Sequence, residues 1–412
     1  MRIAMGASST TKARAELRNR EDIVIVGAGI AGLATAVALH RLGIRSVVLE
    51  QAQSLRAGGT SVTFFKNGWK ALDAIGVGSE LRDQFLEIQG MTVKSEDGRE
   101  LRSFNIKDED ESQEVRAVER RILLETLASR LPPDTISFSS KVKTVKEADE
   151  EGVTLLELED SSQISAKIVI ACDGIRSPVA KWMGFADARY VGYSAIRGLA
   201  CFPDGQFQPY EKKVVYVYGK GVRAAYVPVS QSKVYWFVCF NSPSPGSKIT
   251  DPSILRGESE KLLRGWPEEL FGLIKLTPDE SIVRSPLVDR WLWPGITPSP
   301  SNGNVVVVGD AWHPMTPNLG QGACCALEDA VVLSKKLAEA MRNGRHEGVR
   351  EALDGYGKER WGRMFGLTVY SNLLGGVLQN ENSVVCSLRD DVIVPKFASL
   401  KAMLRHTDVN LD

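Results

Sequence analysis

The chain has 412 residues, of which 43% are hydrophobic and 25% are charged, and this composition is typical of a folded globular protein rather than a disordered or fibrous one. Its 51 basic and 51 acidic residues balance, so net charge gives no argument for binding nucleic acid or an acidic membrane surface. The length suggests two or three domains.

The cysteines and histidines give no sign of a metal site. None of the six cysteines belongs to a C-x-x-C pair, and the four histidines are scattered, whereas zinc sites need closely spaced ligands. Buried, reduced thiols are expected, including the adjacent Cys324 and Cys325, and they favour an intracellular location.

The N-terminal residues 1–20 are basic and contain several Ser and Thr residues. We expect a flexible tail, or the remnant of a transit peptide, which would place the protein in the cytoplasm or in a plastid respectively. The longest apolar stretch, residues 23–39, is interrupted by glycines, so no transmembrane segment is expected there.

The first ordered unit is a predicted strand, turn and helix that carries three glycines. Residues 22–26 are a short β-branched run typical of a buried parallel strand, and residues 30–42 form an apolar helix. Gly27, Gly29 and Gly32 lie between them in the pattern G-x-G-x-x-G. Such glycines permit a tight turn, a close approach of a pyrophosphate and close packing of helix on strand, respectively.

Glu50 completes this nucleotide-binding pattern at the end of the next strand, residues 45–49. A carboxylate at this place accepts hydrogen bonds from ribose hydroxyls and repels a 2′-phosphate. The unit therefore predicts a site for FAD or NAD rather than NADP, and the glycine loop alone does not choose between the two.

The middle of the chain alternates between helical and extended patterns. Residues 61–86 look helical with breaks at glycines, residues 91–106 form a hairpin, and residues 121–131 form an amphipathic helix. Strands are then predicted at residues 136–145, 153–158 and 164–171, and the apolar run 168–171 should be central. Asp173 and Gly174 follow that strand directly, at the edge where ligand crevices open in parallel sheets.

Residues 190–290 change in character. Aromatic-rich runs at 214–218, 223–229 and 233–240 are separated by turn residues, which indicates an antiparallel sheet, and residues 251–266 and 268–276 look helical. A buried valine strand at 305–308 then leads into Gly309 and Asp310. Helices are predicted over 321–342 and 349–378, and a helix in the C-terminal tail, which includes 369–378 and 392–404, is a candidate for a covering or contact role.

The segment after Asp310 is a loop stiffened by Pro314 and Pro317, and Gly320 and Gly322 open the long helix. An acidic residue here can accept hydrogen bonds from ribityl hydroxyls. A helix N-terminus presents free N–H groups and a positive dipole end, which suits the negative charge of a reduced flavin.

The three motifs, in this order and spacing, resemble the single-component, aromatic-hydroxylase type of FAD-dependent monooxygenase. Residues 67–72 (Asn-Gly-Trp-Lys-Ala-Leu), 179–182 (Val-Ala-Lys-Trp) and 195–199 (Ala-Ile-Arg-Gly-Leu) are similar to the plant branch related to zeaxanthin epoxidase and salicylate-hydroxylase-like proteins. The resemblance covers residues 22–378.

The resemblance implies a set of FAD contacts. Arg120 matches the arginine with which the family contacts FAD, although the adjacent Arg121 is an alternative. The implied cofactor-binding residues are Gly27, Gly29, Ala31, Gly32, Glu50, Arg120, Asp173, Gly174, Asp310, Gly320, Gln321, Gly322 and Ala323.

The resemblance also implies a reaction. NADPH or NADH binds transiently and reduces the flavin, and O2 then forms a flavin C4a-hydroperoxide that hydroxylates or epoxidises a small substrate, of aromatic, isoprenoid or alkaloid type. The sequence has no second strand–GxGxxG–helix unit for the nicotinamide cofactor, in keeping with such transient binding. No catalytic side chain is assigned, because the protein's part is to position the reactants and exclude water.

Substrate contacts are expected from the sheet of residues 190–290. The aromatic candidates are Tyr216, Tyr218, Tyr226, Tyr235 and Trp236, although which of them face inward depends on the register. Arg197 and Arg223 are candidates to meet a carboxylate, and Pro317 is a candidate from the loop.

The predicted fold class is α/β: a Rossmann-like FAD-binding domain interrupted by a mixed or antiparallel β-sheet substrate domain, with a helical C-terminal segment. The predicted FAD-binding parts are residues 21–90, 115–187 and 289–345; the substrate parts are the hairpin 91–114 and the sheet 188–288; and residues 346–412 form the C-terminal segment.

Three questions stay open at the level of sequence. The C-terminal segment is a candidate for core packing, a cover over the domain junction, a contact with a membrane surface or a dimer contact, so the chain is expected to be a monomer or a homodimer. Two other functions stand beside the monooxygenase: an FAD-binding regulatory protein that has lost oxygenation, and a flavin halogenase or reductase. The preference for NADPH or NADH is also open.

Overall fold

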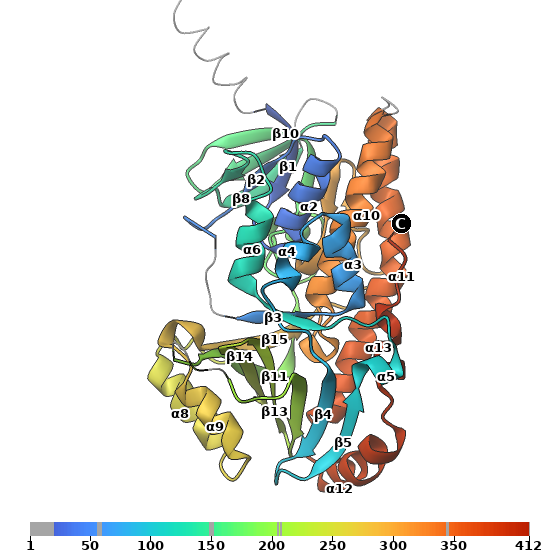
Figure 1. The fold of residues 1–412 in the computed structure, drawn as a ribbon. Coiled ribbons are helices and arrows are strands. Elements are labelled where there is room, and N and C mark those ends of the chain that lie inside the picture. Colours follow the sequence, from blue (N-terminus) through green and yellow to red (C-terminus); the bar gives the residue numbers. More distant parts are fainter. Residues whose placement is uncertain are drawn as a thin grey trace, which may run out of the picture.

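The structure is a computed structural model that describes residues 20–55, 60–147, 152–203, 206, 208–342 and 346–411. It confirms the predicted α/β class: a helix-covered sheet forms one half and a second sheet the other (Figure 1). Of the predicted N-terminal tail, only Arg20 lies within the described residues.

The first sheet is built on short β-branched runs that pair in parallel, as their near-continuous apolar character predicts. Its order is β16-β17-β10-β1-β2-β7, and β8 and β9 extend it from β10. The strands from β17 to β7 pair in parallel, whereas the pairs β16–β17, β9–β10 and β8–β9 are antiparallel. The apolar end of β10 pairs on both sides, with β1 and β17, so its predicted central position is confirmed. The strands are β1 (Arg20–Val26), β2 (Val47–Leu49), β7 (Ile136–Ser137), β8 (Val142–Glu147), β9 (Thr154–Leu158), β10 (Gln163–Ala171), β16 (Ser301–Asn302) and β17 (Val305–Val307).

Helices cover this sheet and include the two long helices of the C-terminal half (Figure 1). Helix α2 (Ile30–Arg41) packs tightly on β1. A Cβ on Gly32 would lie only 1.9 Å from the carbonyl oxygen of Gly27. Gly32 therefore has the packing role that the motif predicts. These helices are α2 (Ile30–Arg41), α6 (Arg120–Ala128), α7 (Pro178–Trp182), α10 (Gly322–Arg342) and α11 (His346–Leu378).

The second sheet has the order β15-β11-β14-β13-β12-β4-β5 and is antiparallel except for the parallel pair β12–β4. The predicted hairpin at 91–106 is confirmed as β4 and β5, which extend the sheet. Helices α8 (Pro252–Leu262) and α9 (Glu268–Lys275) pack on one face, and their apolar residues share a core with the sheet. The strands are β4 (Gly90–Ser95), β5 (Glu100–Asn105), β11 (Arg189–Cys201), β12 (Lys213–Tyr218), β13 (Val222–Ser230), β14 (Lys233–Asn241) and β15 (Val283–Asp289).

One predicted helical stretch differs in the structure. The prediction of helix from residue 61 is wrong for β3 (Ser61–Phe64), which pairs with β6 (Arg116–Glu119) from a distant part of the chain; α3 (Lys66–Ala74) and α4 (Gly78–Arg82) follow it. The C-terminal segment is helical as predicted, and it includes an irregular helix that contains Pro395 and ends before α13. The remaining helical turns are α5 (Ile106–Glu109), η1 (Asp279–Ser281), η2 (Gly309–Ala311), η3 (Pro317–Leu319), α12 (Ser383–Leu388), η4 (Arg389–Phe397), α13 (Leu400–Leu404) and η5 (Arg405–Thr407).

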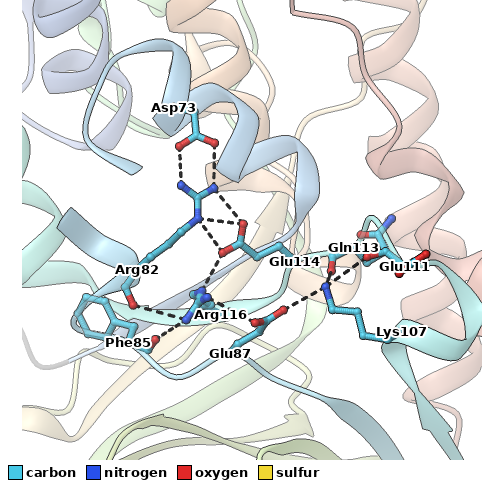
Figure 2. A network of polar contacts seen from close by, with 9 residues as sticks. All are labelled: Asp73, Arg82, Phe85, Glu87, Lys107, Glu111, Gln113, Glu114 and Arg116. Carbon is cyan, nitrogen blue, oxygen red and sulfur yellow. Dashed lines mark hydrogen bonds and ion pairs between the residues drawn. The ribbon is translucent and has the colours of Figure 1, made fainter. Parts of the chain in front are cut away.

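A network of ion pairs joins the two halves beside β6 (Figure 2). Arg82 at the end of α4 donates to Asp73 on α3 at 2.6 Å and to Glu114 at 2.8 Å. Arg116 on β6 shares Glu114 at 2.8 Å and lies 3.5 Å from Glu87 in the segment that leads into β4. The network fixes the start of the β4–β5 hairpin against the helices of the nucleotide-binding half.

Candidate cofactor and substrate site

One cavity of about 1360 Å³ runs between the two halves of the protein. It is larger than the roughly 300–1,000 Å³ of a typical single-ligand pocket. Its wall includes the glycine loop, the Asp173-Gly174 turn, the Gly309-Asp310 loop and the inner face of the second sheet. The three sequence motifs, distant along the chain, therefore meet at one site.

The glycine loop lies open to the cavity at the N-terminus of α2. Gly27 has a φ of 100°, a left-handed conformation that favours glycine. A Cβ added to Gly29 would meet no atom within 4 Å, so space for a ligand lies directly against this backbone. No side chain caps α2, which leaves its N-terminal N–H groups available to phosphates.

Glu50 is held in place beside this loop. Its carboxylate accepts hydrogen bonds from the N–H groups of Ala28, at 2.8 Å, and Ala52, at 2.9 Å. The residue is only 5% exposed, yet it lines the cavity. A fixed carboxylate at the end of β2 is what recognition of a ribose hydroxyl requires.

Asp173 is a buried carboxylate with no hydrogen-bond partner among the described residues. It lines the cavity at the end of β10, and Gly174 beside it has a φ of 81°. Loss of solvent raises the pKa of Asp173 to about 7. An unpartnered buried carboxyl group costs free energy, so this group is suited to a partner supplied by a ligand.

The structure separates the two arginine candidates at the start of α6. Arg120 lines the cavity, and its charge partly offsets the burial that raises the pKa of Asp310. Arg121 forms an ion pair with Glu125 at 3.0 Å, and its side chain is 43% exposed. Of the two, Arg120 is therefore the one placed to contact a cofactor.

The Gly309-Asp310 loop brings a carboxylate to the N-terminus of α10. Gly309 has a φ of 60°, and Asp310 projects into the cavity. Burial raises the pKa of Asp310, against the nearby charges of His313 and Arg120. Gly320, Gly322 and Ala323 also line the cavity; Gln321 does not, because its side chain turns inward to accept a hydrogen bond from Asn67 at 2.8 Å. Gln321 was predicted among the cofactor-binding residues, and it is not among the residues that line the cavity.

A buried ionic network supports this loop from behind, and no sequence pattern indicates it. Asp329 accepts hydrogen bonds from the N–H of Gly309 at 3.2 Å and from Arg360 at 2.8 Å, and lies 2.6 Å from His313 Nε2. Burial would raise the pKa of Asp329, but His313 and Arg360 hold it at about 2. Arg360 also donates to Glu328 at 2.6 Å. The loop is thereby fixed to α10 and α11.

Arg197 and Arg223 face the cavity from the second sheet. Each has a buried Nε without a hydrogen-bond partner among the described residues. Arg197 donates from its terminal nitrogen to Ser285 at 2.7 Å, and Arg223 donates to Asn318 on the loop before α10. Both guanidinium groups are positioned by the protein and keep one donor unused.

The register decides which aromatic candidates reach the cavity. Tyr216, Tyr218, Tyr235 and Pro317 line it. Trp236 does not: it is fully buried on the opposite face, where its indole nitrogen donates to Thr277 at 2.7 Å. Its prediction as a substrate contact is wrong, because alternate strand residues point to opposite faces.

Tyr226 pairs with Trp236 across β13 and β14 and shares its face. Tyr226 is among the residues that border the cavity, but its ring packs against Tyr210 with the ring centres 5.1 Å apart. Tyr226 is therefore a core residue rather than a ring offered to the substrate.

Two cavity residues were missed from the sequence. Asn318 is the partner of Arg223, and Phe237 faces the cavity from β14. The alternation of β14 could have indicated Phe237 once the inner face was known, whereas Asn318 depends on a contact between segments distant in sequence. Residues of the C-terminal segment close one side of the cavity, in agreement with the covering role that was one of the alternatives for that segment.

The residues at this site fit FAD. The open glycine loop, the fixed Glu50, the unpartnered Asp173 and the free N-terminus of α10 offer recognition groups for ribose, pyrophosphate and flavin along one cavity. No group of His, Cys, Asp or Glu among the described residues could hold a metal ion. No helix in the described part of the chain is long and apolar enough to cross a membrane.

Similar proteins of known family include FAD-binding proteins and monooxygenases. Residues 20–272 and 274–367 match the family described as an FAD binding domain. The chain is 35% identical to "Monooxygenase 2" of Arabidopsis thaliana, with 94% of this chain and 97% of that protein covered. It is 28% identical to a chloroplastic zeaxanthin epoxidase of an Oncidium hybrid cultivar, over 83% of this chain and 53% of that protein.

A solved structure shares the fold over most of both chains. It is Klebsiella pneumoniae HpxO complexed with FAD and uric acid, with a TM-score of 0.80 and 25% sequence identity, covering 94% of this chain and 96% of that one. Together with the three motifs around one cavity, these similarities show that the chain belongs to the FAD-binding-domain family of FAD-dependent monooxygenases.

Proposed function

We propose that this protein uses NADPH or NADH and O2 to hydroxylate or epoxidise a small organic substrate that Arg197 and Arg223 recognise through an anionic or carbonyl group. The observation that carries the proposal is the pair of unused Nε donors on these two arginines, both facing the cavity. A buried donor left without a partner costs about 1–3 kcal/mol, and an acceptor on the substrate would relieve that cost.

The family's cofactor assigns roles to the other residues of the cavity. In this proposal Gly27, Gly29 and Glu50 hold the adenosine and pyrophosphate part of FAD, and Asp173, Asp310 and the N-terminus of α10 hold the ribityl chain and the flavin ring. Bound FAD supplies hydride acceptance and oxygen activation. The helix N-terminus stabilises negative charge on the ring, and Asp310 orients the chain that carries it.

In this proposal the protein positions the substrate beside the flavin and excludes water from the reacting groups. The inner face of the second sheet is lined by Tyr216, Tyr235 and Phe237, and α8 and α9 seal its outer face with a separate core. A substrate bound by the arginines would lie between this sheet and the flavin, where water is excluded. Exclusion of water limits side reactions of reactive oxygen species.

The arginine assignment predicts a specific loss of substrate affinity. Replacement of Arg223 with Met keeps most of the side-chain volume and removes the donors. A hydrogen bond to a charged group contributes about 1.5–3 kcal/mol, so the substrate dissociation constant should rise roughly 10- to 100-fold. It is measured through the perturbation of the flavin spectrum on titration with any compound that stimulates NAD(P)H oxidation.

The control is Trp236→Phe, in the same sheet but on its opposite face. It should leave substrate affinity unchanged. Monooxygenation itself is tested with ¹⁸O2, where the product should gain one labelled oxygen atom. An unlabelled product, or an Arg223→Met variant with wild-type substrate affinity, would argue against the proposal.

A further inference from the structure

The C-terminal segment, residues 389–406, forms one wall of the cavity and is anchored on both halves of the protein. At its start, Asp391 pairs with Arg99 at 2.8 Å and the carbonyl of Pro395 accepts from Arg102 at 2.9 Å, both on the β4–β5 side. Just beyond its end, Asp408 pairs with Lys66 on α3, in the nucleotide-binding half, at 2.6 Å. Figure 1 shows this segment running beside β4 and β5 toward α3. The segment is thus part of the site, and polar contacts fix its position at both ends.

Eight residues of this wall line the cavity, and six of them are apolar: Ile393, Val394, Ala398, Leu400, Met403 and Leu404.

The surfaces beside this wall are apolar as well. Met91, Val93 and Phe104 line the cavity from the β4–β5 hairpin, and Leu374 and Val377 line it from α11. Burial of hydrocarbon surface against such walls is favourable in proportion to its area.

The polar side chains of the wall carry little free charge into the cavity. Arg389 is paired with Asp390 at 2.6 Å and donates to the carbonyl of Leu378 at 3.1 Å. Burial lowers the pKa of His406 to about 4, so its ring is uncharged at neutral pH. The cavity therefore has a cationic region at Arg197 and Arg223 and an apolar region along residues 389–406.

We propose that residues 389–406 form a subsite for a hydrocarbon substituent, so that the substrate is amphipathic: an anionic or carbonyl head at the two arginines and an alkyl or alkenyl chain on the C-terminal wall. The inference rests on the proposed function for the position of the head. It makes the C-terminal segment the element that selects the substrate.

The test uses a series of 4-n-alkylbenzoates, from methyl to hexyl, titrated into the FAD-loaded protein and followed by the flavin spectrum. The carboxylate addresses the arginines and the chain extends away from them. Each CH2 group buried on the wall should tighten binding by up to about fourfold. Affinity should therefore rise steadily along the series in the wild-type protein.

Two substitutions in the wall, and one control, test whether the gain in affinity with chain length arises there. Ala398→Trp fills the subsite and should abolish the gain for longer chains while leaving the affinity for 4-methylbenzoate unchanged. Ala402→Trp is the matched control, because Ala402 is exposed on the same segment and does not line the cavity. Met403→Ala, a milder change, should weaken hexylbenzoate binding several-fold and not that of methylbenzoate.

Equal affinity along the series, no binding of any member, or the same chain-length dependence in Ala398→Trp and Met403→Ala as in the wild type would overturn the subsite. Each of these results leaves the monooxygenase proposal standing if the ¹⁸O2 experiment succeeds with another compound. A wild-type protein that fails to hold FAD would contradict both.

Discussion

Replacement of Arg360 with Met is expected to lower the free energy of unfolding by about 3–5 kcal/mol, the usual cost of leaving a buried charge without its partner. Arg360 is the shared partner of Asp329, at 2.8 Å, and Glu328, at 2.6 Å, and both carboxylates are fully buried. Met preserves much of the volume of the side chain, so the lost charge dominates the effect. The measurement is the midpoint of urea unfolding.

The matched control is Lys336→Met. Lys336 pairs with Glu359 at 2.8 Å between the same two helices, but the side chains are 29% and 51% exposed. An exposed pair contributes about 0–1 kcal/mol, so this variant should unfold close to the wild type. Similar shifts for the two variants would show that the buried network does not stabilise the protein as its geometry indicates.

Replacement of Gly29 with Ala is expected to leave the fold intact and to weaken FAD binding. Gly29 has φ −80° and ψ −172°, an extended conformation that alanine adopts readily. The added methyl group meets no protein atom within 4 Å, so it enters the space where the proposal places the pyrophosphate. Overpacking costs about 1–3 kcal/mol, which corresponds to a roughly 5- to 150-fold loss of FAD affinity.

This prediction is checked by titrating FAD into apoprotein and following the quenching of flavin fluorescence. Gly257→Ala on α8 is the control, because its added Cβ also meets no atom within 4 Å and lies far from the motif in the chain. It should bind FAD as the wild type does. If Gly29→Ala bound FAD with unchanged affinity, the pyrophosphate would not lie against this loop.

Together, Arg360→Met and Gly29→Ala distinguish a residue that stabilises the site indirectly from one that lies against the cofactor. Arg360 reaches the site only through Asp329, which holds the N–H of Gly309 at 3.2 Å, so its loss should reduce stability first. Gly29 lines the cavity directly, so its replacement should change cofactor affinity without changing the unfolding midpoint.

Local patterns predicted the nucleotide-binding unit well. The run of β-branched residues in β1, the glycines after it and the apolar helix α2 form a single local unit, in which each residue's role follows from its neighbours. The hairpin at 91–106 and the helices α8 and α9 were found for the same reason.

Features that depend on distant partners could not be predicted in this way. β3 is extended because it pairs with β6, more than fifty positions along the chain. Trp236 was misplaced because the face of a strand depends on register, and one step along β14 exchanges the cavity for the core. The wall formed by residues 389–406 becomes visible only once the hairpin and α11 are seen beside it.

The buried ionic network around Asp329 also could not be predicted from the sequence. Glu328 and Asp329 look like ordinary helix-surface acids in sequence, yet both are fully buried on α10. Their partners Arg360 and Arg363 lie one helix later. Only the packing of α11 on α10 reveals that these charges are internal.

The most direct test of the account is the flavin content of the purified wild-type protein, measured by releasing the cofactor with heat and identifying it by chromatography. One cavity that joins the glycine loop, Asp173 and Asp310 predicts one FAD per chain, retained through purification or restored by adding FAD. A protein that carries no flavin and binds none on addition would contradict the assignment of this cavity.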